Sequence, residues 1–222
     1  MSLLEICTET LSGVHAATAG GAQRIELCSA LDLDGLSPSE ELITAARAAT
    51  DLELLIMVRP NPGAFVVNSA TLQTMCAQIQ RAHALGVDGF VCACLLPNHQ
   101  IDLPTLQQLV AASDGLPVTF HRAFDLLPDP FVACDLLSDY GVQRILTSGG
   151  ATTALEGAAV LQTLVAHASQ RIEIVVGGAV RAGNIQQLRA LTGAHSFHSA
   201  LDRAPTVLAV LELATAAGPP CE

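Results

Sequence analysis

The stretch Leu54-Leu55-Ile56-Met57-Val58 is an uninterrupted aliphatic run, and Ile172-Glu173-Ile174-Val175-Val176 is a second run of similar composition. Short runs of this kind are typical of parallel strands that other elements cover on their outer face. Such segments alternate with amphipathic stretches along the whole chain. We expect strands at 3–7, 24–28, 54–59, 88–94, 117–121, 143–148, 172–176 and 195–198, and helices at 10–20, 38–49, 69–85, 104–113, 130–139, 153–168, 182–192 and 205–216.

A similar helix-to-strand turn recurs as Ala19-Gly20-Gly21-Ala22, Ala84-Leu85-Gly86-Val87 and Asp139-Tyr140-Gly141-Val142. Glycine at this position is typical of the end of a helix. Eight such β-α units in 222 residues predict one α/β domain, a single (β/α)8 TIM barrel over residues 1–217. A doubly wound open sheet is the alternative. We expect residues 218–222 to form a flexible tail.

The composition excludes several classes of function. The formal net charge is −11, which argues against nucleic-acid and anionic-membrane partners, because phosphate groups bind basic patches. All ten basic residues are arginines, so the chain has neither a Schiff-base lysine nor a P-loop lysine.

The N-terminus shows no signal-peptide pattern, and the chain contains no apolar stretch long enough to span a membrane. The seven cysteines include no C-x-x-C pair. These observations predict a cytoplasmic protein with reduced thiols.

Two segments near the N-terminus repeat one pattern, Leu4-Glu5-Ile6-Cys7 and Ile25-Glu26-Leu27-Cys28. Residues two apart in a strand share a face, so each segment places a carboxylate and a thiol on the same side. If the strands are neighbours, two carboxylates and two thiols converge on one site. The alternative is that both cysteines are small buried hydrophobic residues.

Polar side chains recur at the ends of other expected strands, which is where (β/α)8 barrels carry their active sites. His121 is suited to proton transfer near neutral pH, and Arg59 or Arg122 could clamp an anion. Each carboxylate could be a base or one half of a buried ion pair, with Arg59 or Arg122 as the expected partner of Glu5. The candidate catalytic residues are Glu5, Glu26, Arg59, His121, Arg122 and Asp125, and His198 is a further candidate.

Glycine pairs follow two expected strands, in Ser148-Gly149-Gly150 and in Gly177-Gly178, and each pair precedes an expected helix. Backbone N–H groups at such turns bind anions, and barrels often hold phosphate after the seventh and eighth strands. The candidate anion-binding residues are therefore Ser148, Gly149, Gly177, Gly178 and Arg181. Ordinary tight turns are the alternative.

Seven segments occur in a characteristic order: L-E-I-C at 4–7, G-A-Q-R-I-E-L-C-S at 21–29, R-P at 59–60, V-T-F-H-R-A-F-D at 118–125, R-I-L-T-S-G at 144–149, G-G-A-V-R at 177–181 and F-H-S at 197–199. Over nearly the whole chain this pattern resembles the CutC family of copper homeostasis proteins. The resemblance implies a TIM barrel, a homodimer, and Cu(I) bound through the metal ligands Cys7 and Cys28. Two thiolates are a donor set that suits this soft ion.

The chain departs from the family pattern after Arg59-Pro60. The family usually reads R-G-G-D-F with a tyrosine two residues later, whereas this chain reads Asn61-Pro62-Gly63-Ala64-Phe65 with Val67 in the place of the tyrosine. Cys92 and Cys94 also differ from the family, which usually carries residues without thiols at the fourth expected strand. This pair shares one face of the strand and is a less favoured metal site than Cys7 and Cys28.

Three hypotheses follow for the function. The chain binds Cu(I) through Cys7 and Cys28, or it is an enzyme acting on a small anionic or phosphorylated metabolite. In the enzyme, His121 and a carboxylate would move a proton while arginines and glycine turns hold the anion. The third hypothesis is a scaffold whose polar groups form a buried ion-pair network.

Overall fold

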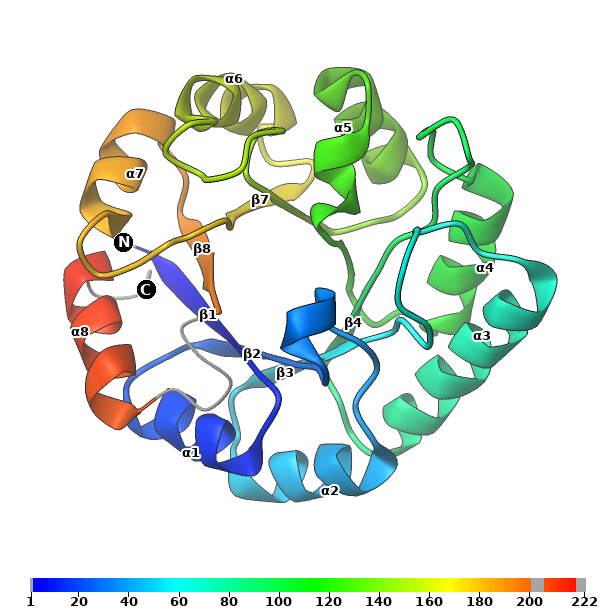
Figure 1. Cartoon of the computed structure of the whole chain (residues 1–222), viewed down its shortest axis with the longest axis horizontal. Helices are drawn as coiled ribbons and strands as arrows, with labels where there is room; N and C mark the ends of the chain where they lie inside the picture. The colour runs from blue at the N-terminus through cyan, green and yellow to red at the C-terminus, as the bar shows by residue number, and fades with distance from the viewer. Residues whose placement is uncertain (1, 201–205, 219–222) are drawn as a thin grey trace.

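The computed structural model describes residues 2–200 and 206–218. Within them, eight parallel strands pair in chain order and form a closed barrel. In Figure 1 the strands occupy the centre and the helices form an outer ring. The strands are β1 (Leu3–Thr8), β2 (Arg24–Leu27), β3 (Glu53–Met57), β4 (Gly89–Cys92), β5 (Val118–Phe120), β6 (Arg144–Thr147), β7 (Glu173–Val176) and β8 (Ser196–Ser199).

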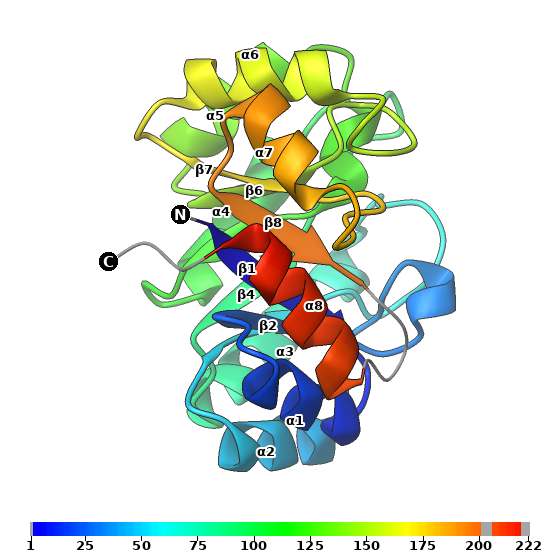
Figure 2. The same ribbon diagram turned by 90° about the vertical axis from the view of Figure 1, so that its left-hand side faces the viewer.

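A helix follows each strand and covers the outside of the barrel. Figure 2 shows this arrangement from the side, with α8 lying across the outside of the strands. The α-helices are α1 (Leu11–Ala19), α2 (Glu40–Ala49), α3 (Ser69–Ala84), α4 (Leu103–Ala112), α5 (Pro130–Asp139), α6 (Ala158–Ala168), α7 (Ile185–Thr192) and α8 (Val207–Ala217). Two 3-10 helices, η1 (Leu31–Leu33) and η2 (Arg122–Leu126), follow β2 and β5.

The barrel closes through pairing of the first and last strands. Leu3 lies opposite Ser196 and Glu5 lies opposite His198 in this parallel pair. The predicted (β/α)8 TIM barrel is therefore confirmed, and the alternative of an open sheet is wrong because an open sheet would leave these two edges unpaired. The homodimer that the resemblance implies stays a prediction.

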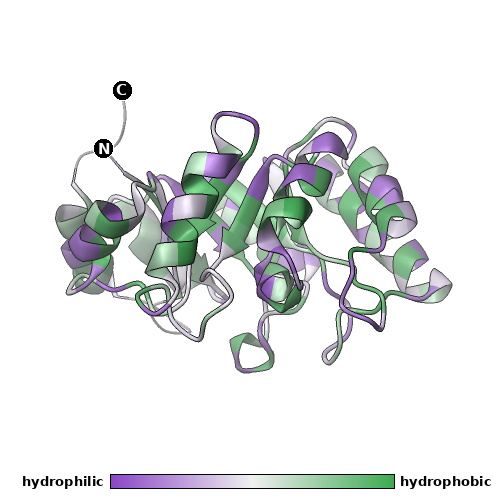
Figure 3. Cartoon of the chain, turned by 90° about the horizontal axis from the view of Figure 1, so that it is seen from above, coloured by the Kyte–Doolittle hydropathy of each residue, from purple (hydrophilic) through white to green (hydrophobic). Residues whose placement is uncertain are grey.

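Helix starts follow the local sequence. The side chains of Thr10, Ser39, Asn68 and Asp129 each accept a backbone N–H from the first turn of the helix that follows. Figure 3 shows helices banded with hydrophobic and hydrophilic residues, as expected for helices with one face on the barrel and one in water. None of the helices in residues 2–200 and 206–218 is both long enough and apolar enough to cross a membrane.

Some boundaries differ from the prediction. The helix expected at 153–168 begins only at Ala158, because Gly157 packs against the preceding turn and the residues before it form turns. The 3-10 helices η1 and η2 lie in segments that we expected to be loops. Gly218 ends α8, and residues 219–222 of the expected tail lie outside the described part of the chain, as does residue 205 of the last expected helix.

The interior of the barrel carries a network of charged side chains towards the amino ends of the strands. Arg24 Nε lies 2.5 Å from Glu5 Oε2, and Arg24 Nη2 lies 3.2 Å from Glu173 Oε1. Arg144 bridges Glu53 and Glu173 from the other side, with Nε 3.1 Å from Glu173 Oε2. These five residues connect β1, β2, β3, β6 and β7 beneath the site described next.

Candidate functional site

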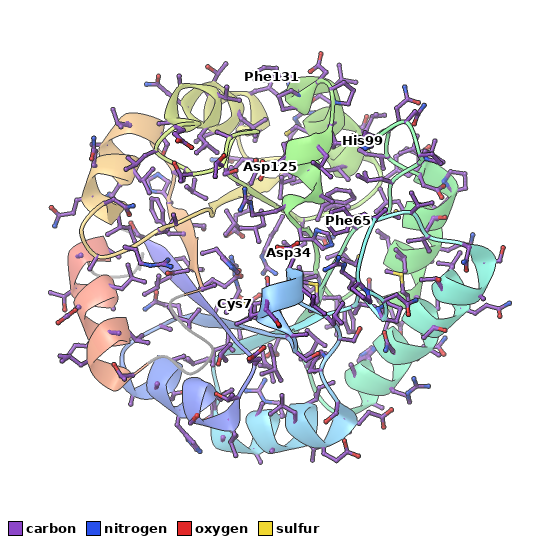
Figure 4. All side chains as sticks on the ribbon, in the orientation of Figure 1. Cys7, Asp34, Phe65, His99, Asp125 and Phe131 are labelled. Carbon is purple, nitrogen blue, oxygen red and sulfur yellow. The ribbon has the colours of Figure 1, made fainter. Side chains whose placement is uncertain are left out.

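A cavity of about 560 Å³ opens at the carboxyl ends of the strands. Its polar lining includes Glu26, His121, Arg122, Arg181 and His198, together with the thiol-bearing Cys7. In Figure 4, Cys7, Asp34, Phe65 and Asp125 lie around the centre of the ring, whereas His99 and Phe131 lie towards its outside. The predicted strand-end residues of β1, β2, β5 and β8 therefore share one cavity.

His198 is held by a buried carboxylate. Its Nδ1 lies 2.6 Å from Glu5 Oε1, and the side chain of Glu5 is 1% exposed. Burial raises the pKa of Glu5, but Arg24 and His198 outweigh it and lower the pKa to about 2, so Glu5 is ionised and accepts the Nδ1 proton. Burial lowers the pKa of His198, but Glu26 and Glu5 outweigh it and the pKa is raised.

The partner of Glu5 corrects one prediction. We expected Arg59 or Arg122 to pair with this carboxylate, but the structure pairs it with Arg24. Arg24 is the first residue of β2 and was not among the candidate site residues. Arg24 lies two residues before Glu26 on the same strand, so both side chains point into the barrel. The two-residue period of a strand could therefore have identified Arg24 from the sequence.

Glu26 is a second buried carboxyl group beside His198. Its Oε2 lies 3.9 Å from His198 Nδ1 and has no hydrogen-bond partner among the described residues. Burial raises the pKa of Glu26 above its ordinary value, an effect that His198 partly offsets. A buried carboxyl group with a raised pKa and a free oxygen in a cavity is suited to giving and taking a proton.

The two predicted thiol ligands lie next to each other. Cys7 Sγ lies 3.6 Å from Cys28 Sγ and donates to Glu26 Oε1 at 3.3 Å. Both cysteines are buried and pack with Leu55, Met57 and Val91, and of the two only Cys7 lines the cavity. The contact with Cys28, burial and the nearby Glu26 all raise the pKa of the Cys7 thiol.

One cluster with metal-ligand geometry occurs in the described part of the chain. The ligand atoms of Cys7, Glu26 and His198 all lie within 4.8 Å of one another, and all three residues are buried. Cys92 and Cys94, the less favoured pair, instead face the hydrophobic core outside the barrel, where Cys94 Sγ donates to the carbonyl of Asp102.

His121 lines the cavity and precedes the first residue of η2. Its Nδ1 accepts the backbone N–H of Ala123 at 3.1 Å, and its ring centroid lies 4.9 Å from that of Phe65. Burial, and then the charge of Arg59, lower the pKa of His121 to about 3. His121 is therefore a neutral imidazole at physiological pH.

Arg59 uses its guanidinium to join two loops. Its Nη1 donates to the carbonyls of Leu33 and Gly35, and its Nη2 donates to that of Gly63. The guanidinium also lies 4.8 Å from the ring centroid of Phe65. This arrangement favours a positioning role, and a direct role of Arg59 in catalysis stays a prediction.

Asp125 binds the turn after β6. Its oxygens accept from Arg122 Nε, from the N–H and hydroxyl groups of Ser148 and from the N–H of Gly150. Thr147 also donates its hydroxyl to this carboxylate. Asp125 thus occupies the N–H of Ser148, while Gly149 donates its N–H to Thr147 Oγ1. Anion binding at this turn and catalytic roles for Asp125 and Arg122 stay predictions.

The second glycine turn, at Gly177 and Gly178, keeps one backbone N–H without a partner among the described residues. Gly177 donates its N–H to the carbonyl of Thr147, whereas no described residue bonds to the N–H of Gly178, which lines the cavity. Arg181 donates Nη1 to the carbonyl of Val180 and forms no ion pair within residues 2–200 and 206–218. Anion binding here stays a prediction, with Arg181 as the cation that no described carboxylate neutralises.

A family model described as the CutC family matches residues 2–203. The chain belongs to the CutC family. A family protein CutC of Xylella fastidiosa (strain Temecula1) is 39% identical over 196 residues, which cover 88% of this chain and 73% of that relative. A CutC relative from Bacteroides thetaiotaomicron is 42% identical over 195 residues, which cover 87% of this chain and 78% of that relative.

Solved structures agree with this membership in the CutC family. The CutC protein of Streptococcus agalactiae, named for copper homeostasis, has a TM-score of 0.85 and 36% identity, covering 89% of this chain and 98% of that one. Thiamine phosphate pyrophosphorylase of Pyrococcus furiosus has a TM-score of 0.66 at 15% identity, covering 97% of this chain and 95% of that one. The second likeness concerns the fold alone.

Within this CutC-family barrel, the sequence identified most of the ionisable side chains that line the cavity, but not Asp34 or the charges beneath the cavity. Arg24, Glu53, Arg144 and Glu173 form the charged network that holds Glu5. Phe65, which packs against His121, was also missed. The strand period could have identified the inward-facing charges, but Phe65 lies in a loop whose path no periodicity predicts.

Proposed function

We propose that this chain is an enzyme that moves a proton on a small molecule bound in the cavity, with Glu26 as the acid–base residue. One observation carries the proposal: the Oε2 of Glu26 is buried without a hydrogen-bond partner among the described residues, beside His198 and at the edge of the cavity. A buried, unpaired carboxyl oxygen costs stability and is expected where chemistry requires it.

The charges around Glu26 favour reversible protonation of its carboxyl group. Four buried or half-buried carboxyl groups, Glu5, Glu26, Glu53 and Glu173, are connected to two arginines and to His198. With His198 protonated and all four carboxyl groups ionised, the group carries one net negative charge. Burial raises the pKa of Glu26, so this carboxylate is the member best suited to accept a proton from a bound molecule.

His198 supports this chemistry in a defined orientation. Glu5 accepts its Nδ1 proton, which leaves Nε2 as the ring nitrogen that can act on a bound molecule. A carboxylate that orients an imidazole in this way is a recurrent arrangement in acid–base catalysis. Glu26 would take a proton from the bound molecule and return it, while His198 stabilises the charge that develops.

The test compares two glutamate variants. Wild type, Glu26→Gln and Glu212→Gln are incubated with a metabolite mixture, and NMR follows consumption and deuterium incorporation from D2O. Glu26→Gln keeps the side-chain shape but cannot exchange a proton, so we expect conversion to fall by about 10²–10⁴-fold. Glu212 lies exposed on the outer helix α8, and its variant serves as the control.

A folded Glu26→Gln protein that converts the same molecule at the wild-type rate would refute the proposal. Absence of any conversion by the wild type across the mixture would also count against it. Thermal unfolding of both variants establishes whether a loss of activity reflects a loss of structure.

The adjacent thiols favour a second candidate, Cu(I) binding by Cys7 and Cys28. The 3.6 Å between the two sulfurs carries this candidate, because a soft monovalent ion favours two close thiolates. Glu26 and His198 could complete the donor set, since their ligand atoms lie near Cys7 Sγ. The raised pKa of Cys7 means that binding would release a proton and strengthen with rising pH.

Competition with a chromogenic Cu(I) chelator under reducing conditions tests this candidate. We expect about one Cu(I) per chain, lost in Cys7→Ser/Cys28→Ser and kept in Cys76→Ser, because Cys76 lies on α3 outside the barrel. Equal binding by the double variant and the wild type would exclude these thiols as the ligands.

A further inference from the structure

The hydrogen bond to His121 determines which ring nitrogen carries the proton. The backbone N–H of Ala123 donates to Nδ1 at 3.1 Å, so Nδ1 must present a lone pair. A neutral imidazole then carries its proton on Nε2. No described residue bonds to Nε2, and the ring lines the cavity, so this N–H is available to a bound molecule.

The surroundings keep His121 in this state. Its ring packs against Phe65, and Phe65 lies under the guanidinium of Arg59, so a fixed positive charge is close to the imidazole. The other charged groups at this end of the cavity are Asp34, whose charge acts on Arg59, and the pair Arg122 and Asp125, which neutralise each other. Protonation of Nδ1 would also break the bond from Ala123, so geometry and charge both oppose it.

We infer that His121 is a fixed hydrogen-bond donor to the carbonyl oxygen of an anionic carbonyl substrate, and not a proton-transfer residue. This inference rests on the proposed function, in which Glu26 moves the proton. It differs from the expectation that His121 acts as the acid or base, because in this tautomer the ring nitrogen that is free to contact a ligand already carries its proton.

The cavity contains a hydrogen-bond donor for the carbonyl oxygen of such a substrate and a cation for its anionic group. A carbonyl oxygen accepts hydrogen bonds but donates none, which matches the donor that His121 presents. Arg181 lines the same cavity and has no ion pair within the described residues, so it is the group that can receive an anionic end. An amine or other cationic substrate would instead meet two groups of the wrong polarity.

The step that this arrangement supports is proton removal next to the carbonyl. The Glu26 carboxylate takes a proton from the neighbouring carbon, and the electrons of that C–H bond form a C=C bond. The carbonyl π electrons move onto oxygen, where His121 Nε2–H stabilises the negative charge. Return of the proton from Glu26 to the same carbon restores the carbonyl group and the ionised carboxylate.

The first experiment measures the tautomer in the wild-type chain without any ligand. Long-range ¹H–¹⁵N NMR spectra distinguish a protonated from an unprotonated ring nitrogen, and contacts with the Phe65 ring identify His121. We expect a proton on Nε2, a bare Nδ1, and no titration of this ring from pH 5 to pH 9. A proton on Nδ1, or a titration within that range, would overturn the inference.

The second experiment uses pyruvate and propionate, which share a carboxylate and differ in the carbonyl oxygen. We expect pyruvate to shift the His121 Nε2–H resonance and to bind about five- to tenfold more tightly than propionate, because one hydrogen bond is added. The His15 ring, exposed on α1, is the control for non-specific effects. Equal binding of the two acids, or no shift at His121 with either, would overturn the inference.

Failure of this inference is distinguishable from failure of the proposed function. If His121 titrates but the Glu26→Gln variant still loses its activity, only the donor role of His121 is refuted. If the tautomer and the pyruvate preference are as expected while Glu26→Gln stays fully active, the donor role stands and the assignment of Glu26 falls.

Discussion

At the scale of the single residue, Glu5 connects the interior of the barrel to the cavity. One of its oxygens contacts Arg24 at 2.5 Å and the other contacts His198 at 2.6 Å. A buried carboxylate costs several kcal/mol unless it is paired, and Glu5 is paired on both oxygens. The same side chain therefore stabilises the barrel and fixes the orientation of His198.

This pairing predicts a defined loss of stability in acid. The pKa of Glu5 is lowered from 4.5 to about 2, so its contribution to the free energy of unfolding is complete above pH 4.5 and disappears as the pH falls towards 2. At about 1.4 kcal/mol per pKa unit, that contribution is on the order of 3 kcal/mol.

Urea unfolding from pH 7 to pH 2 measures this contribution. We expect Glu5→Gln to be less stable than the wild type at pH 7 and the difference to narrow as the pH falls towards 2. Glu212→Gln should follow the wild-type curve throughout. A difference between wild type and Glu5→Gln that is the same at every pH would contradict the assignment.

At the scale of the element, the turn between β6 and α6 shows how closely backbone segments approach at the mouth. A Cβ added to Gly157 would lie 1.9 Å from the carbonyl oxygen of Ser148, and one added to Gly149 would lie 2.7 Å from that of Gly157. Gly149 also has φ of +74°, a conformation that favours glycine. The two glycines allow the turn to close around Asp125.

Gly157→Ala is therefore expected to destabilise the chain by about 1–3 kcal/mol, because the contact is with backbone that cannot move aside. Gly183→Ala is the matched control, since a Cβ there meets nothing within 4 Å. Chemical unfolding of both variants checks the prediction. Equal stability of the two proteins would mean that this turn relaxes without cost.

Sequence patterns predicted the elements better than they predicted the site. Apolar runs and glycine turns gave eight β-α units because one strand and one helix each bury a periodic face. The pairing of Arg24 with Glu5 depends on which residues of neighbouring strands lie opposite each other, and register is a tertiary property. The neutral state of His121 depends on one backbone N–H and one loop aromatic, neither of which has a local sequence signature.

At the scale of the whole molecule, charge is distributed unevenly between interior and surface. In the interior network, the arginines and His198 offset most of the negative charge of the carboxylates. Most of the net charge of −11 therefore belongs to exposed acidic residues. Like charges on a compact surface repel one another and lower stability. Added salt screens this repulsion, while the buried ion pairs are screened much less.

Moderate salt is therefore expected to raise the melting temperature. Between about 0.01 M and about 0.1 M NaCl the screening length falls from about 30 Å to about 10 Å. A gain of about 1 kcal/mol would raise Tm by about 2–4 °C for a chain of this size. Thermal unfolding across this range measures the shift, and a fall in Tm would show that exposed ion pairs outweigh the repulsion.

The way Arg59 holds its loops has a consequence for how this barrel can diversify. All three of its acceptors are main-chain carbonyls, at Leu33, Gly35 and Gly63, and every amino acid supplies that group. Side chains in the 61–67 segment can thus be exchanged over evolutionary time while the anchoring of the segment persists. The sequence Asn61-Pro62-Gly63-Ala64-Phe65 is therefore compatible with this anchoring, because Arg59 binds the main chain of the segment and not its side chains.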